Sequence, residues 1–126
     1  IELVHSGRRA HPAYLPEDGQ VWGPSPSVNH YGAEVIEMTE DMMDEIADAY
    51  AEAAFMAKFA GVDMVMIHGG HGWLLDQFLS PLNNKRTDRY GGSLENRARF
   101  PIMVLDRVRA RCGSKFPIEY RISGSD

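Results

Sequence analysis

Two histidines lie three residues apart in the run His68-Gly69-Gly70-His71-Gly72, directly after a stretch with the pattern of a buried strand. The glycines let the backbone turn sharply, so the two imidazoles could point at one oxygen atom and donate hydrogen bonds to it. Such a pair would polarise a carbonyl group. A second interpretation stays open, in which one histidine is a satisfied core residue and the other a loop residue.

A zinc site is the other chemistry that histidines could serve. It needs three or four ligands, and the remaining candidates show no recognised metal spacing: His5, His11, His30, Asp76 and Cys112. We therefore expect no metal site.

Arg121 stands inside an apolar, strand-like segment that runs from Pro117 to Ser123. An unpaired buried charge is too costly to keep in a sheet. The guanidinium must therefore be solvated, paired with a carboxylate or bound to a ligand.

A cluster of basic residues could suggest a nucleic-acid surface: Lys85, Arg86, Arg89, Arg97 and Arg99. Asp88 and Glu95 lie among them, which favours a salt-bridged loop and helix start instead.

The elements that must position these residues alternate between strands and helices. Strand patterns cover Ile1 to Val4, Val62 to Ile67 and Pro117 to Ser123. Thr39 is a suitable N-cap for a helix to about Phe59, and Ser93 for a second helix that ends before Gly113 and is kinked at Pro101. Apolar residues of the first helix recur at three- and four-residue spacing, which predicts a buried stripe: Met43, Ile46, Ala47, Tyr50, Ala54 and Ala57.

This order predicts the α/β class, with two right-handed βαβ units and parallel strands. The segment from Gly7 to Glu37 is rich in glycine and proline and is expected to be a long functional loop. Ligands sit at the carboxyl ends of parallel strands, which is where the His68 to Gly72 run begins.

The charge and composition indicate a small-molecule partner rather than nucleic acid or a membrane. The net charge of −5 is spread through the 126 residues, and stretches such as Met64 to Ile67 are too short to cross a bilayer. A single cysteine, Cys112, cannot form an internal disulfide. We expect a cytoplasmic protein. The chain opens and closes on strand-like runs without caps, which predicts a piece of a larger domain.

The run HGGHGWLLDQFLSPLNNKRTDRYGGSLENRARF, from His68 to Phe100, closely resembles the signature of the Old Yellow Enzyme family of NADH:flavin oxidoreductases, which includes the bacterial dienoyl-CoA reductases. ELVHSGR, from Glu2 to Arg8, resembles the family's third-strand motif, and YRISGSD, from Tyr120 to Asp126, its fifth-strand motif. Only the connection from about Pro12 to Glu37 carries no such motif.

The resemblance implies an eight-stranded TIM (β/α)8 barrel with FMN across the carboxyl ends of the strands. Residues 1–126 would be the central portion of that single domain, about strands 3 to 5, and would be inactive and bind FMN weakly alone. The electron donor would be NADH or NADPH, and an iron–sulfur cluster and FAD could lie in regions outside the chain. The bare strand edges predict a covering chain, so we expect a homo-oligomer.

The resemblance also implies roles for five residues. His68 and His71 match the pair that holds the substrate's carbonyl oxygen, and Arg121 matches an arginine at the flavin edge. Glu2 stands where the family usually has a flavin-binding glutamine, so its carboxylate would need a proton or a neighbouring cation such as Arg121. Trp73 stands where many members have a proton-donating tyrosine, and an indole is no general acid.

Three functions remain open from the sequence. The first is FMN-dependent, NAD(P)H-driven reduction of an α,β-unsaturated carbonyl compound or an enoyl- or dienoyl-CoA by hydride transfer. The second is a dehydrogenase or amine demethylase on the same barrel, which needs no proton donor at Trp73. The third is a non-catalytic half-barrel.

Overall fold

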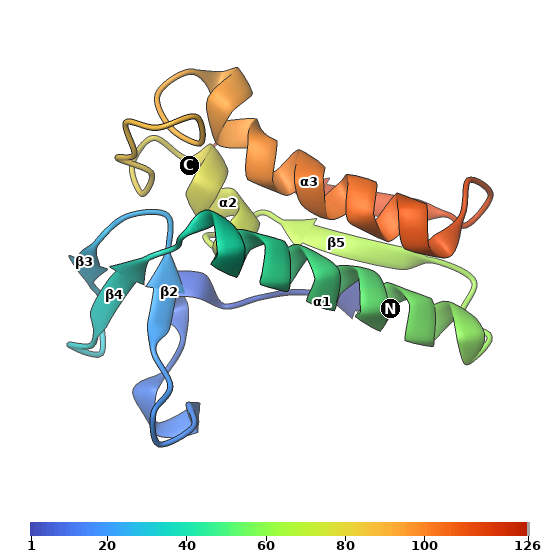
Figure 1. Cartoon of the computed structure of the whole chain (residues 1–126), viewed down its shortest axis with the longest axis horizontal. Helices are drawn as coiled ribbons and strands as arrows, with labels where there is room; N and C mark the ends of the chain where they lie inside the picture. The colour runs from blue at the N-terminus through green and yellow to red at the C-terminus, as the bar shows by residue number, and fades with distance from the viewer. Residues whose placement is uncertain (126) are drawn as a thin grey trace.

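Three parallel strands form the central sheet of the computed structural model, which describes residues 1–125. They are β1 (Glu2–Leu3), β5 (Val65–Gly69) and β6 (Ile118–Ile122), in the order β1-β5-β6 (Figure 1). The register places Glu2 opposite Met66 and His68 opposite Arg121. The predicted parallel arrangement is therefore confirmed, although β1 has only two residues.

Two long helices, α1 (Glu40–Phe59) and α3 (Leu94–Cys112), lie side by side along this sheet (Figure 1). Thr39 Oγ1 accepts from the Met42 N–H at 3.3 Å, and Ser93 caps α3 in the same way. Both predicted helices are confirmed, and every member of the predicted apolar stripe of α1 is buried. Pro101 lies within α3 and does not end it.

The core lies between these helices and the sheet. Val65 and Ile67 of β5 are fully buried and pack in one cluster with apolar residues of α1 and α3.

The central strand differs in extent from the strand expected at Val62 to Ile67. Residues 62–64 carry the chain from the end of α1 to the sheet, since Gly61 has a φ of 88° and the Val62 N–H still bonds to the Ala57 carbonyl at 3.0 Å. Pairing with β6 then extends β5 to Gly69. His68 consequently lies inside the strand rather than just beyond it.

The segment expected to be a long loop, Gly7 to Glu37, contains regular structure, which corrects that interpretation. It holds two 3-10 turns, η1 (Gly7–Arg9) and η2 (Pro12–Tyr14), and a second sheet of β2 (Val21–Gly23), β3 (Ser27–Val28) and β4 (Glu34–Glu37). β4 lies in the middle, parallel to β2 and antiparallel to β3. These strands are two to four residues long, which is too short for a periodic pattern of apolar residues to predict them.

A further short helix, α2 (Leu74–Leu79), follows the histidine run and was not predicted. Leu74, Leu75 and Phe78 are fully buried, and the Phe78 ring lies 4.6 Å from that of Phe100 in α3. The helix is one and a half turns long and owes its stability to this packing rather than to its own propensity.

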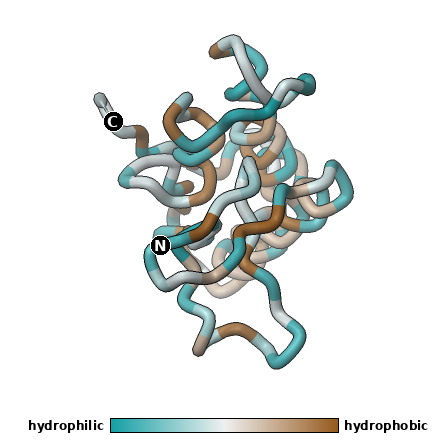
Figure 2. Tube along the Cα trace, turned by 90° about the vertical axis from the view of Figure 1, so that its left-hand side faces the viewer, coloured by the Kyte–Doolittle hydropathy of each residue, from teal (hydrophilic) through white to brown (hydrophobic). Residues whose placement is uncertain are grey.

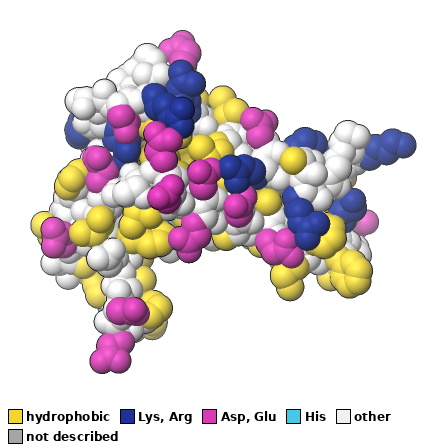
Figure 3. Space-filling model, in the orientation of Figure 1, with side chains coloured by type: hydrophobic (Ala, Val, Ile, Leu, Met, Phe, Trp, Pro, Cys, Tyr) yellow, Lys and Arg dark blue, Asp and Glu magenta, His cyan; other side chains and the backbone are white. Residues whose placement is uncertain are grey.

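The outer face of α1 and α3 carries acidic and basic side chains side by side (Figure 3). Arg107 pairs with Asp44 at 2.6 Å and with Asp48, and Arg111 pairs with Glu52 at 3.0 Å. Hydrophobic and hydrophilic stretches alternate along the trace (Figure 2), and no helix within residues 1–125 has the length and apolarity to span a membrane.

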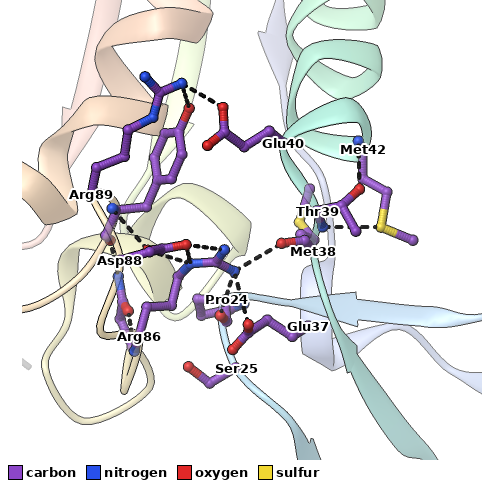
Figure 4. Close-up of polar contacts among 12 residues, drawn as sticks. Pro24, Ser25, Glu37, Met38, Thr39, Glu40, Met42, Arg86, Asp88 and Arg89 are labelled. Atoms are coloured by element: carbon purple, nitrogen blue, oxygen red, sulfur yellow. Dashed lines mark hydrogen bonds and ion pairs between the residues drawn. The ribbon is translucent and has the colours of Figure 1, made fainter.

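The predicted salt bridges form at two of the five basic residues, Arg86 and Arg89, whereas Lys85 and Arg97 donate to backbone carbonyls and Arg99 to Asn96. Arg86 pairs with Asp88 at 2.6 Å, and Arg89 pairs with Glu40 of α1 rather than with a neighbour in its own segment (Figure 4). These pairs join the connection to the start of α1.

Candidate functional site

Four of the residues singled out in the sequence lie together in the structure: Glu2, His68, His71 and Arg121. The β5–β6 register puts His68 and Arg121 on adjacent strands at the same level, near the carboxyl ends of both. Glu2 enters from β1, and one of its carboxylate oxygens contacts His68 Nδ1 and lies 3.5 Å from Arg121 Nη1. The parallel sheet therefore assembles one polar cluster from three segments far apart in sequence.

Glu2 lies between two potential cations. The hydrogen bond with His68, followed by the charges of His68 and Arg121, holds the pKa of the Glu2 carboxyl below its usual range. The carboxylate is therefore ionised at neutral pH and accepts hydrogen bonds only. The negative charge of Glu2 is therefore balanced by a neighbouring cation such as Arg121, and the carboxyl does not need a proton of its own.

The two imidazoles bond to each other rather than lying as two parallel donors. His68 Nε2 and His71 Nδ1 are 3.1 Å apart, and His68 Nδ1 is already engaged with Glu2. Both ring nitrogens of His68 thus have partners, which leaves His71 Nε2 as the nitrogen of the pair with no bond to residues 1–125. The arrangement differs in this respect from the converging donors expected from the spacing.

This chain of contacts determines which nitrogens carry protons. An ionised Glu2 requires a proton on His68 Nδ1, so a neutral His68 can only accept at Nε2, from His71 Nδ1–H. A neutral pair then leaves His71 Nε2 as an acceptor. One additional proton on the pair converts His71 Nε2 into a donor.

The turn that carries His71 is fixed by contacts from two other segments. His71 adopts a φ of 56°, and within residues 1–125 it is the one non-glycine residue with a positive φ. Its N–H donates to Ser123 Oγ at 2.8 Å, and its carbonyl accepts from Arg9 Nη1 at 2.6 Å. A left-handed residue costs about 1 kcal/mol or more, and these two bonds offset that cost.

The glycines of the run are required by the close approach of β6. A Cβ at Gly69 would lie 2.0 Å from the Tyr120 hydroxyl, and one at Gly70 would lie 2.9 Å from Ser123 Oγ. Both distances are shorter than van der Waals contact. The sequence reasoning ascribed these glycines to a sharp turn, whereas the structure shows that they admit the neighbouring strand.

Trp73 lies at the N-cap position of α2 and is half-buried. Its ring centroid is 6.3 Å from that of His68, at nearly a right angle, and the Arg9 guanidinium lies over its ring at 4.9 Å. The indole therefore forms an aromatic wall beside the histidines.

All of residues 1–126 match the NADH:flavin oxidoreductase / NADH oxidase family. The chain belongs to this family. A metal reductase of Desulforamulus reducens is 44% identical over 125 residues, which are 99% of this chain and 19% of that protein. An NADPH dehydrogenase of Bacillus licheniformis is 41% identical over 127 residues, which are 100% of this chain and 35% of that protein.

The solved structure of Old Yellow Enzyme from Pichia sp. AKU4542 superposes on 96% of this chain and 34% of that enzyme, with a TM-score of 0.87 and 37% identity. The Old Yellow Enzyme resemblance and the α/β class, with β1, β5 and β6 as part of a β/α barrel, are thereby confirmed. The chain spans between about a fifth and a third of the length of these relatives.

Two residues that shape this family member's site were missed by the sequence reasoning. Gln77 is 1% exposed, accepts from the Arg8 N–H at 3.0 Å and donates to the carbonyls of Ser6 and Gly72. Arg9 bonds to the His71 carbonyl from the opposite side. A glutamine inside an apolar run was the available signal for the first, while nothing local marked Arg9.

Proposed function

We propose that the protein containing this chain is an FMN-dependent oxidoreductase that uses NADH or NADPH to reduce an α,β-unsaturated carbonyl compound or an enoyl- or dienoyl-CoA. Residues 1–126 would be the central portion of its single FMN-binding barrel domain. The observation that carries the proposal is the cluster of Glu2, His68, His71 and Arg121, which the three parallel strands bring together.

The cluster fits an FMN ring. Arg121 is about half exposed and uses one nitrogen on Glu2, so its other N–H groups can meet the ring edge, where a cation stabilises the anionic reduced form. Glu2 offers acceptor oxygens to a ring N–H, and its charge is balanced by His68 and Arg121. FMN, when bound, supplies hydride chemistry. Arg121 and Glu2 would hold and orient it.

The histidine pair would bind the substrate's carbonyl oxygen. Negative charge develops on that oxygen as hydride reaches the β-carbon, and a preorganised donor stabilises it. His71 Nε2 is the available nitrogen, and it donates when the pair carries one added proton. Glu2 contacts His68 Nδ1 and so fixes the orientation of the pair, which makes Glu2 a positioning residue for the carbonyl as well as a cofactor ligand.

A second candidate function is favoured by Trp73. Reduction of an alkene also requires a proton at the α-carbon, and an indole N–H does not serve as a general acid. A flavin-dependent dehydrogenase or amine demethylase on the same barrel removes hydride from its substrate and needs no donor there. Trp73 would then shape the pocket as an aromatic wall, as its contacts with His68 and Arg9 indicate.

The two candidates separate in a stopped-flow experiment on the intact protein. Under the first, the purified yellow protein is bleached by NADH or NADPH and reoxidised by cinnamaldehyde in the absence of oxygen, with the saturated aldehyde as product. Under the second, cinnamaldehyde leaves the reduced flavin unchanged. A colourless protein that takes up no FMN would refute both and support a non-catalytic role.

The lengths of the relatives differ, and a longer chain has room for further cofactors outside the part that matches residues 1–126. The Desulforamulus reductase is about five times as long as the part that matches this chain, whereas the Bacillus enzyme is about three times as long. We propose that a protein of the longer type would hold an iron–sulfur cluster and FAD outside residues 1–126, and that one of the shorter type would hold FMN alone. Iron analysis and the FMN to FAD ratio test this. A cytoplasmic location suits Cys112, which is free and 1% exposed.

A further inference from the structure

A polar pocket of about 290 Å³ lies beside the histidine turn, at Gly72. Its lining combines two guanidinium groups, an imidazole, two side-chain amides and a glycine backbone: Arg8, Arg9, Asn29, His30, Gly72 and Asn83. Within residues 1–125 no carboxylate lines it, although the chain as a whole carries a net charge of −5. The pocket is thus a positively charged region on a chain of negative net charge, and such a region attracts anions.

The two arginines of the pocket have no carboxylate partner within residues 1–125. Arg8 Nη1 donates to Asn83 Oδ1 at 2.6 Å, which fixes its position without neutralising it. Arg9 uses Nη1 on the His71 carbonyl at 2.6 Å. A guanidinium has five N–H donors, so most of those on Arg9 remain for a ligand. By contrast, Arg86 and Arg121 are each paired with an acid.

Arg9 joins this pocket to the proposed catalytic residues. It holds the carbonyl of His71, lies 4.9 Å above the Trp73 ring, and comes so close to Gly72 that a Cβ there would be 3.3 Å from Arg9 Nη1. A ligand that binds at His71 and Trp73 therefore lies beside the Arg9 guanidinium. Stacking on the indole and the bond to His71 hold the fork of the guanidinium in place, which suits bidentate binding of a carboxylate or phosphate.

We propose that this pocket is an anion subsite, in which Arg9 with Arg8 and His30 binds a carboxylate or phosphate group of the compound bound over the histidine pair. The inference rests on the proposed function and narrows it to reactants that carry such an anion. The anion belongs either to the unsaturated substrate or to the nicotinamide dinucleotide, and both present the same chemistry to Arg9.

The test uses Arg9→Gln in the intact flavoprotein, with Arg99→Gln as the matched control because Arg99 is exposed on α3 and bonds to Asn96. Three pairs of compounds differ by an anion: carboxycinnamaldehyde and cinnamaldehyde, crotonyl-CoA and crotonyl-pantetheine, and NADPH and NADH. KM is measured for each, together with the dissociation constant from the flavin absorbance change.

We expect Arg9→Gln to weaken the anionic member of at least one pair by about 10- to 100-fold relative to its neutral or less charged partner. Arg9→Lys should recover part of the loss, and added salt should reduce the discrimination of the parent protein. The pair affected identifies the source of the anion. Arg99→Gln should change none of the ratios.

Equal changes within every pair would overturn the subsite, because they would show that Arg9 only supports the His71 turn. That result is distinct from failure of the proposed function, in which the parent protein itself binds no flavin or turns over none of the compounds.

Discussion

Arg86 is expected to be the residue of the α2–α3 connection on which stability most depends. Its side chain is 5% exposed and reaches across to two other segments (Figure 4). Nη1 donates to the Pro24 carbonyl at 3.0 Å and to the Met38 carbonyl at 2.8 Å, while Nη2 bonds to Asp88 at 2.6 Å. One guanidinium therefore joins the second sheet and the start of α1 to the connection.

The magnitude follows from what a substitution would leave behind. Arg86→Met keeps much of the apolar stem but deprives two buried carbonyls of their donor, at about 1–3 kcal/mol each. The Asp88 carboxylate left behind is 45% exposed, so water compensates most of the broken pair. We expect the free energy of unfolding to fall by about 2–6 kcal/mol, which is the sum for the two carbonyls.

Arg89→Met is the matched control, because Arg89 lies in the same connection and also pairs with a carboxylate. Its side chain is 62% exposed and its partner, Glu40, is 53% exposed, so the loss should be close to nothing. Urea denaturation followed by circular dichroism measures both variants, with unchanged slopes as the check that midpoints report stability. If Arg86→Met lowered the free energy of unfolding no more than Arg89→Met does, the reasoning would be refuted.

Three further predictions concern ionisation and the proton donor. Glu2→Gln should slow cinnamaldehyde-driven flavin reoxidation in stopped-flow measurements, because the carboxylate that holds the Nδ1 proton of His68 is gone; an unchanged rate would contradict the positioning role. Trp73→Tyr should leave flavin reduction by nicotinamide nearly unchanged and speed reoxidation by an enone by about 10² to 10⁴-fold, and slower reoxidation would show that the tryptophan has another role. The hydrogen bond from Arg86 is the main reason that the pKa of Asp88 lies below 3.8, so ionised Asp88 contributes stability above that pH and loses it as the pH falls through the lowered pKa. Asp88→Asn should therefore lower the urea midpoint at neutral pH, and the difference from the parent protein should narrow below pH 3.8; a constant difference would be inconsistent with this linkage.

The sequence predicted the parts of the fold that have local signals. Thr39 and Ser93 mark the starts of α1 and α3 because a hydroxyl oxygen caps backbone N–H groups wherever the chain turns into a helix. The apolar stripe of α1 and the β-branched residues of β5 likewise predicted what is buried. Such signals depend on neighbours within a few residues.

The short elements had no such signals. β2, β3 and β4 satisfy their backbone groups only on one another, and α2 is held by the contact between Phe78 and Phe100. Strand pairing over a dozen residues and ring packing between helices are long-range terms, so a glycine- and proline-rich sequence reads as a loop until they are known.

The candidate site divides in the same way. The sequence by itself determined which chemical groups are present, and its motifs predicted that Glu2, the two histidines and Arg121 belong to one site. Only the tertiary structure decided how they pair, with Glu2 on His68 Nδ1, the two rings on each other, and Arg9 on the His71 carbonyl. The physical reason is that a hydrogen bond depends on angstrom-scale positions of atoms on separate strands, and the folded sheet alone sets those positions.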